Sequence, residues 1–218
     1  MNTADTTPGV AVLVFGDARV PGRLNGLPIR RADGPTDSAA IDDAIGPHRR
    51  LAVVGGDADL AAVLSRLLRA ERLDVEVAYV PRRRTAATRV YRVASGRRAA
   101  RRARRGRARR VPLIRDETGS VIVGRASWRP AEDREPLHGE AVVDDTALFD
   151  GDVDGVDIEP TLAVPGLRAR TAGGRWITGR AVQLGSTGVV VVRDGVPASR
   201  SARRSTFYRH VEGWLQVR

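Results

Sequence analysis

The hydrophobic pattern in the first half of the chain alternates buried strands with helices. Val10–Phe15 and Leu51–Val54 are continuous apolar runs, the pattern of strands that a parallel sheet buries on both faces. Residues 60–68 place apolar side chains at helical spacing, and Val75–Val80 is a third strand, which Pro81 ends. With a shorter helix after the first strand, this order predicts a Rossmann-like α/β layer with a mainly parallel sheet.

The pattern changes beyond Val111. Short β-rich segments, such as 121–123 and 189–193, alternate with turns rich in Gly, Asp and Pro. Almost no stretch there has helical spacing, which indicates an all-β domain of the sandwich type. The sequence therefore predicts two domains, an α/β nucleotide-binding-like domain over residues 1–116 and a β-sandwich over residues 117–218.

Composition narrows the chemistry. The 218 residues include no cysteine and no lysine, so disulfides, cysteine-ligated zinc, Schiff-base catalysis and a phosphate-binding P-loop lysine are excluded. The amino terminus has no basic segment followed by an apolar run, and no apolar stretch approaches the roughly 20 residues that span a bilayer. We therefore expect a cytoplasmic protein that is at most peripheral at a membrane.

Arginine gives the chain a net charge of +11, and this charge is uneven. Residues 1–117 hold 24 arginines and 13 acidic residues, whereas residues 118–218 hold 13 of each. Nine of the fourteen positions in 97–110 are arginine, and three adjacent candidates for anion binding precede them: Arg82, Arg83 and Arg84. These arginines could bind anionic lipid headgroups or nucleic acid, or they form a solvated helix face in a protein with GC-rich coding. Nucleic acid is the weaker candidate, because aromatic residues do not interleave with them and no zinc-finger spacing occurs.

A glycine turn joins the second buried strand to its helix. Gly55 and Gly56 let backbone N–H groups approach an anion closely, and the positive end of the helix points to the same place. We therefore regard Gly55, Gly56, Asp57 and Ala58 as candidate nucleotide-binding residues. The turn is also explained without a ligand, as a tight turn in which Asp57 or Asp59 caps the helix.

The run Leu51–Asp57 resembles the signature of diacylglycerol kinases, sphingosine kinases and related bacterial lipid kinases, a hydrophobic strand that ends in Gly-Gly-Asp-Gly-Thr. Later features follow in that family's order: a strand ending at Pro81, a link over 110–116, and Arg193–Pro197, which resembles the family's Asp-Gly-Glu-Pro turn. The resemblance implies the NAD kinase/diacylglycerol kinase-like fold, with the active site in the cleft between the α/β domain and the β-sandwich. It also implies ATP and magnesium as cofactors and a lipid hydroxyl as the acceptor.

Several residues depart from that family's pattern. Ala58 replaces the third glycine, where a Cβ crowds the phosphate, and Asp59 replaces threonine with a negative charge. Nothing remains of the family's second glycine-rich stretch. Val196 stands where the family has its general base, and valine cannot accept a proton. Asp194 and Gly195 beside it mark the substrate side, and no residue is assigned as catalytic.

We therefore expect a degenerate lipid kinase-like protein that binds nucleotide, anionic lipid or both, with weak or no phosphotransfer. Two alternatives stay open, an active ATP-dependent lipid kinase and a basic non-catalytic protein that binds nucleic acid or an anionic membrane surface.

The oxygen spacing in Asp150–Gly155 matches the first half of a calcium loop, but Thr161 replaces the bidentate glutamate. A polar turn between strands is the simpler explanation, and no metal site is assigned.

Overall fold

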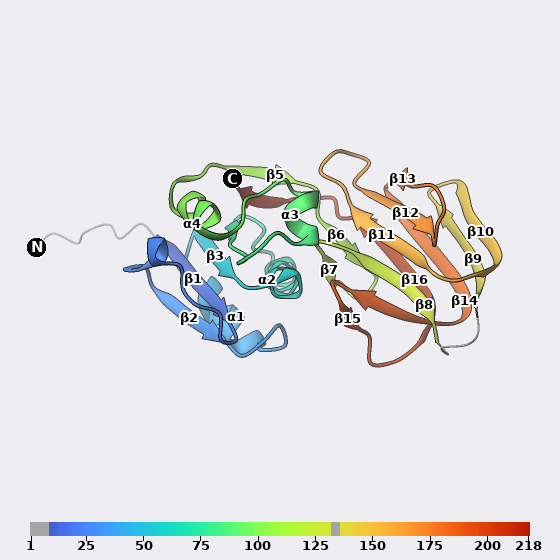
Figure 1. The fold of residues 1–218 in the computed structure, drawn as a ribbon, viewed down its shortest axis with the longest axis horizontal. Coiled ribbons are helices and arrows are strands. Elements are labelled where there is room, and N and C mark those ends of the chain that lie inside the picture. Colours follow the sequence, from blue (N-terminus) through green and yellow to red (C-terminus); the bar gives the residue numbers. More distant parts are fainter. Residues whose placement is uncertain (1–8, 132–135) are drawn as a thin grey trace, which may run out of the picture. The chain divides into compact units, whose positions relative to one another are not determined.

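The computed structural model describes residues 9–131 and 136–218, and Figure 1 draws the chain as a ribbon. Residues 1–8 lie outside the described residues. They form most of the amino-terminal segment in which the sequence indicates no export signal. Within the described ranges, no helix is both long and apolar enough to cross a bilayer. Helices and strands alternate in the first part of the chain, whereas the second part consists almost entirely of strands.

The chain divides into two compact units, each assembled from more than one segment. The first, called the α/β unit, consists of the residues up to Arg84 together with 93–110 and 214–218. The second, called the β unit, consists of 85–92 and 111–213. The division that the sequence suggests after residue 116 differs from this one at three places. Residues 85–92 and 111–116 belong to the β unit, and the last strand belongs to the α/β unit.

A six-stranded sheet forms the centre of the α/β unit. Its strands lie in the order β2 (Ile29–Ala32), β1 (Val10–Phe15), β3 (Arg50–Val54), β4 (Glu76–Tyr79), β17 (Trp214–Val217) and β5 (Ala108–Val111). The neighbours from β2 through β17 are all parallel, with Val12 beside Ala52 and Ala52 beside Ala78. The apolar runs of β1, β3 and β4 are therefore buried in a parallel sheet, as their composition predicts.

Helices cover both faces of this sheet. The helical segments of the unit are η1 (Gly22–Leu24), a 3-10 turn, and α1 (Ser38–Ile45), α2 (Asp57–Arg69) and α4 (Gly96–Arg105). The alanines of α4 and Leu24 of η1 belong to one hydrophobic cluster with Val12 and Val54 of the sheet. Leu13 and Val53, which strand alternation turns to the other face, are also fully buried, and α1 and α2 contact these strands.

An eleven-stranded antiparallel sheet builds the β unit. Its strands are β6 (Ile114–Asp116), β7 (Val121–Ile122), β8 (Ala126–Pro130), β9 (Leu137–Val143), β10 (Thr146–Val153), β11 (Val156–Pro160), β12 (Leu167–Thr171), β13 (Ile177–Gly179), β14 (Ala181–Arg193), β15 (Val196–Pro197) and β16 (Ala202–Arg209). A short helix, α3 (Ala86–Val90), also belongs to the unit. The sheet branches at β14, where 182–186 pair with β9 and 189–193 pair with β8.

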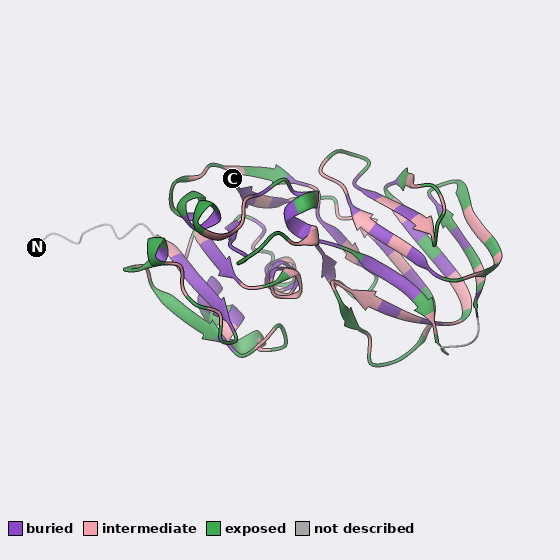
Figure 2. Cartoon of the chain, viewed as in Figure 1, coloured by how far each residue is buried: buried purple, intermediate pink, exposed green. Residues whose placement is uncertain are grey.

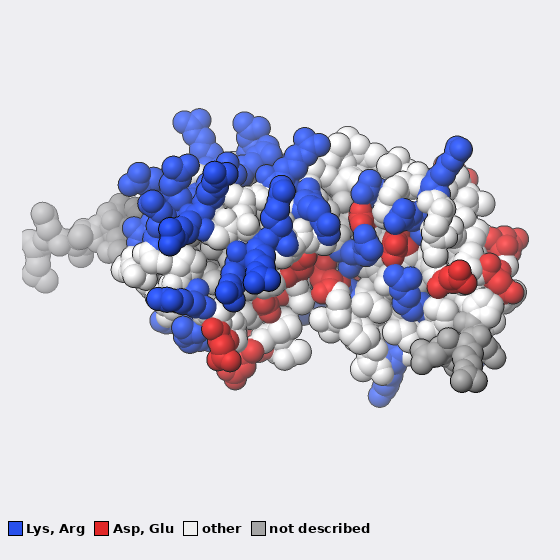
Figure 3. All heavy atoms as spheres, in the orientation of Figure 1, with Lys and Arg blue, Asp and Glu red and all other residues white. Residues whose placement is uncertain are grey.

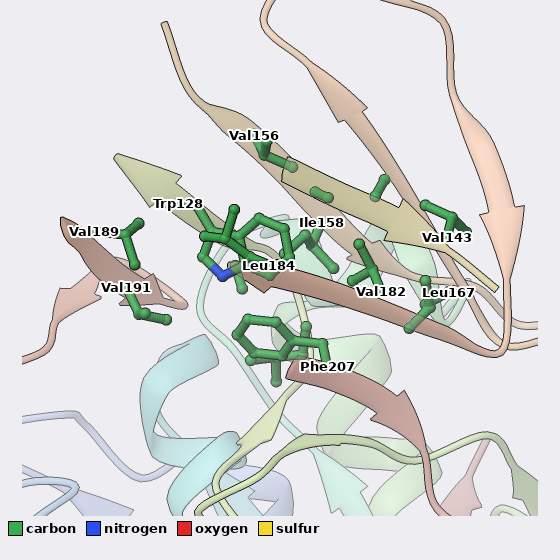
Figure 4. Packing of buried hydrophobic residues seen from close by; sticks show 14 of the residues in the cluster. Trp128, Val143, Val156, Ile158, Leu167, Val182, Leu184, Val189, Val191 and Phe207 are labelled. Atoms are coloured by element: carbon green, nitrogen blue, oxygen red, sulfur yellow. The ribbon is translucent and has the colours of Figure 1, made fainter. Parts of the chain in front are cut away.

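A hydrophobic cluster fills the β unit, and Figure 4 shows its side chains pointing toward one another from several strands. Trp128 of β8 and Phe207 of β16 are fully buried, with ring centroids 6.2 Å apart. The Trp128 indole N–H donates to the Ser205 hydroxyl at 3.0 Å, which satisfies the polar atom that this side chain carries into the core. Figure 2 shows the alternation of buried and exposed residues along these strands. The predicted all-β second domain is confirmed.

The carboxyl-terminal strand differs from the sequence interpretation. The sequence places Trp214–Val217 with the β-rich second half, whereas in the structure this strand pairs in parallel with β4, with Leu215 beside Glu76. Beyond it, the backbones of Arg107 and Arg218 exchange two hydrogen bonds, at 3.2 and 3.1 Å. A short apolar strand looks the same whichever sheet it joins, because its partners lie far away in the sequence.

Candidate functional site

A cavity of about 1320 Å³ opens at the carboxyl ends of the parallel strands of the α/β unit. Its wall comes from the segment after β1, the turn between β3 and α2, the residues after β4 and the first turns of α4. In open α/β sheets this edge is where ligands bind, because loops from several strands converge there. The lining combines four arginines with two acidic residues, Asp17 and Asp59.

The glycine turn between β3 and α2 belongs to this wall, together with Asp59 from the first turn of α2. The Asp59 carboxylate accepts a hydrogen bond from the Gly56 N–H at 2.7 Å, which satisfies a donor at the helix start. A Cβ on Gly55 would come within 2.4 Å of Asp59 Oδ2, so glycine is needed here because a carboxylate of the chain itself lies against it. Burial raises the pKa of Asp59, and the hydrogen bond from Gly56 opposes this shift.

The four candidate nucleotide-binding residues separate into two pairs. Gly55 and Gly56 line the cavity, whereas Asp57 and Ala58 do not belong to the described lining. The Asp57 carboxylate instead accepts a hydrogen bond from the Tyr79 hydroxyl at 2.8 Å. Of the two aspartates considered for capping, Asp59 therefore accepts the N–H of the turn, and Asp57 is engaged with the neighbouring strand.

Four arginines from other segments also line the cavity: Arg19 and Arg23 after β1, Arg82 after β4, and Arg97 in α4. All four residues are exposed. None of them forms an ion pair with a carboxylate within residues 9–131 and 136–218. Guanidinium groups that lack an internal counterion favour a phosphate or a carboxylate as ligand, because they bind both with paired hydrogen bonds.

The structure distinguishes among the arginines that the sequence singled out. Arg82 lines the cavity, whereas Arg83 and Arg84 are exposed outside its described wall. Arg19 and Arg23 were missed by the sequence interpretation. Their signal was position, since they follow the carboxyl end of a buried parallel strand, where ligand-binding loops converge. Figure 3 shows arginine side chains gathered over the α/β unit.

Asp194, expected on the substrate side, holds two backbone segments of the β unit together. Its carboxylate accepts hydrogen bonds from three successive N–H groups, those of Val123–Arg125, at 2.9, 2.7 and 2.9 Å. Asp194 has φ 47° and Gly195 φ 87°, which makes the turn between β14 and β15. Val196 follows with 49% of its surface exposed. The Asp-Gly pair therefore has a structural task of its own in this turn.

The acidic segment at 150–155 is largely a strand. Asp150–Val153 belongs to β10 and pairs with β9, placing Asp152 opposite His138, whose Nδ1 lies 2.7 Å from Asp152 Oδ1. An extended strand cannot wrap its oxygens around an ion, so these residues do not form a calcium loop. The polar turn that the sequence favours here is limited to Asp154 and Gly155, between β10 and β11. Across the described part of the chain, no three His, Cys, Asp or Glu residues form a group that could hold a metal.

Comparison with known proteins gives the fold. A scan against protein-family models finds no match, and a search of curated proteins finds none either. A diacylglycerol kinase from Bacillus anthracis str. Sterne superposes with a TM-score of 0.73 at 10% identity, covering 98% of each chain. An NAD kinase from Archaeoglobus fulgidus in complex with ATP gives 0.65 at 11%, covering 96% of this chain and 93% of that one. Yeast NADH kinase complexed with NADH gives 0.59 at 11%, covering 97% and 84%. The predicted NAD kinase/diacylglycerol kinase-like fold is thereby confirmed.

Replacing Asp194 with alanine is expected to destabilise the β unit by about 3 kcal/mol, because three backbone N–H groups lose a charged acceptor. Urea-induced unfolding followed by circular dichroism measures this change. Asp145→Ala, in the exposed turn between β9 and β10, is the matched control and should leave the midpoint almost unchanged. Equal effects of the two substitutions would contradict the structural role of Asp194.

Asp59→Asn is expected to gain thermal stability over the natural chain as the pH rises from about 4 to about 7. The pKa of the Asp59 carboxyl group is higher in the folded chain than in the unfolded chain, so the free energy of unfolding of the natural chain falls as the pH rises through this interval. Asparagine does not titrate and therefore avoids this loss, and its side-chain oxygen can still accept the Gly56 N–H. Melting temperatures measured across this range test the trend. A difference that does not change with pH, or the same trend in the exposed control Asp33→Asn, would refute it.

Proposed function

We propose that this chain is a degenerate lipid kinase-like protein that binds nucleotide in the cavity of its α/β unit and transfers phosphate weakly or not at all. One observation carries the proposal. Four exposed arginines, none with a carboxylate partner among the described residues, line the same cavity as a glycine turn at the carboxyl ends of a parallel sheet. Such an edge binds ligands in α/β proteins, and such arginines bind phosphates.

Size and charge both suit a nucleotide. The cavity volume of about 1320 Å³ exceeds the roughly 300–1,000 Å³ typical of small-molecule sites, so space does not limit the ligand. Two proteins of the same fold were solved with ATP and with NADH. Magnesium would enter with the phosphates, and Asp17 is a lining carboxylate of the kind that this ion accepts beside phosphate oxygens.

We infer the loss of phosphotransfer from the residues that stand where the lipid kinases have their phosphate-binding turn and their general base. Val196, at the place of the general base, is exposed and aliphatic, so it cannot take a proton from an acceptor hydroxyl. Asp59 brings a negative charge to the glycine turn, where a transferring phosphate needs positive charge.

Calorimetry with ATP tests binding, and labelled ATP offered with diacylglycerols and sphingoid bases tests transfer. Efficient transfer would favour the alternative of an active lipid kinase.

Substitution of the cavity arginines tests nucleotide binding. Millimolar ATP with magnesium should raise the melting temperature of the natural chain, because a ligand that binds the folded state stabilises it. Arg82→Gln/Arg97→Gln should lose most of this shift, since both side chains line the cavity. Arg83→Gln/Arg84→Gln removes the same charge outside the described wall and should keep the shift. Equal losses in the two variants would mean that net charge, and not the cavity, attracts the nucleotide.

A second candidate function, docking to an anionic bilayer, rests on the outer face of α4. Its alanines Ala99, Ala100 and Ala103 are buried, while all six of its arginines are exposed. Two smaller hollows, of about 400 and 250 Å³, are lined by arginines of this helix together with Arg23. The helix presents no aromatic side chain on which bases could stack, so lipid headgroups fit this face better than single-stranded nucleic acid.

Vesicles containing phosphatidylglycerol are expected to sediment with the natural chain at low salt and to release it as salt screens the attraction. Exchanging four arginines of this face for glutamine should abolish sedimentation: Arg98, Arg101, Arg102 and Arg105. The control exchanges four exposed arginines of the β unit, with the same loss of charge: Arg175, Arg200, Arg203 and Arg204. Binding that ignores salt, or that the control loses as completely as the α4 variant does, would exclude docking through α4.

A further inference from the structure

Asp59 occupies the space that an anion would take at the glycine turn. Its Oδ2 lies 2.4 Å from the position of a Cβ on Gly55, and the same oxygen accepts the Gly56 N–H. A phosphate placed on this turn would have to displace the Asp59 carboxylate. Both groups are negatively charged, and at contact distance they repel each other strongly in a partly buried site. The turn is therefore already filled by an anion of the chain itself.

The positive charge of the cavity comes from other parts of its wall. Arg19 and Arg23 follow β1, Arg82 follows β4, and Arg97 lies in α4. These guanidinium groups only donate hydrogen bonds, whereas the Asp59 carboxylate only accepts them. The cavity thus offers two kinds of binding group, one that suits phosphate and one that suits a donor such as a hydroxyl.

One carboxylate oxygen of Asp59 is available to a ligand. Oδ2 is engaged by Gly56, while Oδ1 has no hydrogen-bond partner within residues 9–131 and 136–218. Since the residue lines the cavity, a ligand hydroxyl could donate to this oxygen. Hydrogen bonds from hydroxyl groups to a carboxylate are short and about twice as strong as those between neutral groups.

We propose that Asp59 makes the cavity selective for phosphorylated ligands that also carry vicinal hydroxyl groups, such as nucleotides with an intact ribose. In this arrangement the arginines bind the phosphates and Asp59 accepts the hydroxyls. The hydroxyl groups of the ligand then face the glycine turn and its phosphates face away from it, the reverse of a ligand whose phosphate binds on the turn. The inference rests on the proposed function, because it orients a ligand in the same cavity.

Isothermal titration with three probes in EDTA tests this assignment without metal coordination. The probes are ADP, 2′,3′-dideoxyadenosine diphosphate and pyrophosphate, and the proteins are the natural chain, Asp59→Asn and Asp59→Ala. We expect the natural chain to bind ADP about tenfold or more tightly than the dideoxy analogue, since hydrogen bonds to a charged group are involved. In both variants this ratio should fall to about one, while pyrophosphate binding is kept. Asparagine retains an acceptor for Gly56, and melting curves check that each variant is folded.

Each other outcome has a definite meaning. Equal affinity of the natural chain for ADP and its dideoxy analogue, or a ratio that the substitutions leave intact, would overturn the role of Asp59 and leave nucleotide binding standing. Tighter binding of all three probes to Asp59→Ala, without a hydroxyl preference in the natural chain, would mean that Asp59 only repels phosphate. Failure of the natural chain to bind either ADP or pyrophosphate would overturn the proposed function, and this inference with it.

Discussion

The parallel pairing of β1, β3 and β4 is the constraint on which the candidate site depends. Because these strands run in the same direction, the segments that follow them leave the sheet at one edge. Residues that are far apart in the sequence, such as Arg19, Gly55 and Arg82, therefore line one cavity. An antiparallel arrangement of the same strands would send alternate loops to opposite edges and separate the arginines from the glycine turn.

The elements that the sequence predicted well are those with strong local periodicity. Val10–Phe15 and Leu51–Val54 are strands because only a sheet covered on both faces buries such runs, and the structure has both within a residue of the expected bounds. The last strand could not be assigned in the same way. Trp214–Val217 has a pattern that fits either sheet, and only its pairing with β4, far away in the sequence, decides its place.

The candidate site was foreseen only in part, and for a physical reason. Gly55 and Gly56 could be found because a glycine pair between a strand and a helix is a local signal. Arg19 and Arg23 were missed, because in an arginine-rich chain their one signal is their position after a buried strand, and that position indicates a ligand site only once the topology of the sheet is known. Asp194 shows that a local signal can also have a structural explanation. Its turn resembles a functional motif, but its carboxylate accepts hydrogen bonds from the three backbone N–H groups of Val123–Arg125.

The position of β17 has a consequence for how the molecule is made. This strand lies between β4 and β5 in the sheet, although the whole β unit is translated before it. On the ribosome, the β unit has all of its strands while β4 still presents an open edge, and such edges attract other chains. The α/β unit, first in the sequence, is thus completed last during synthesis, so a nascent chain stalled before Trp214 would carry an unfinished parallel sheet although its antiparallel sheet has all of its strands.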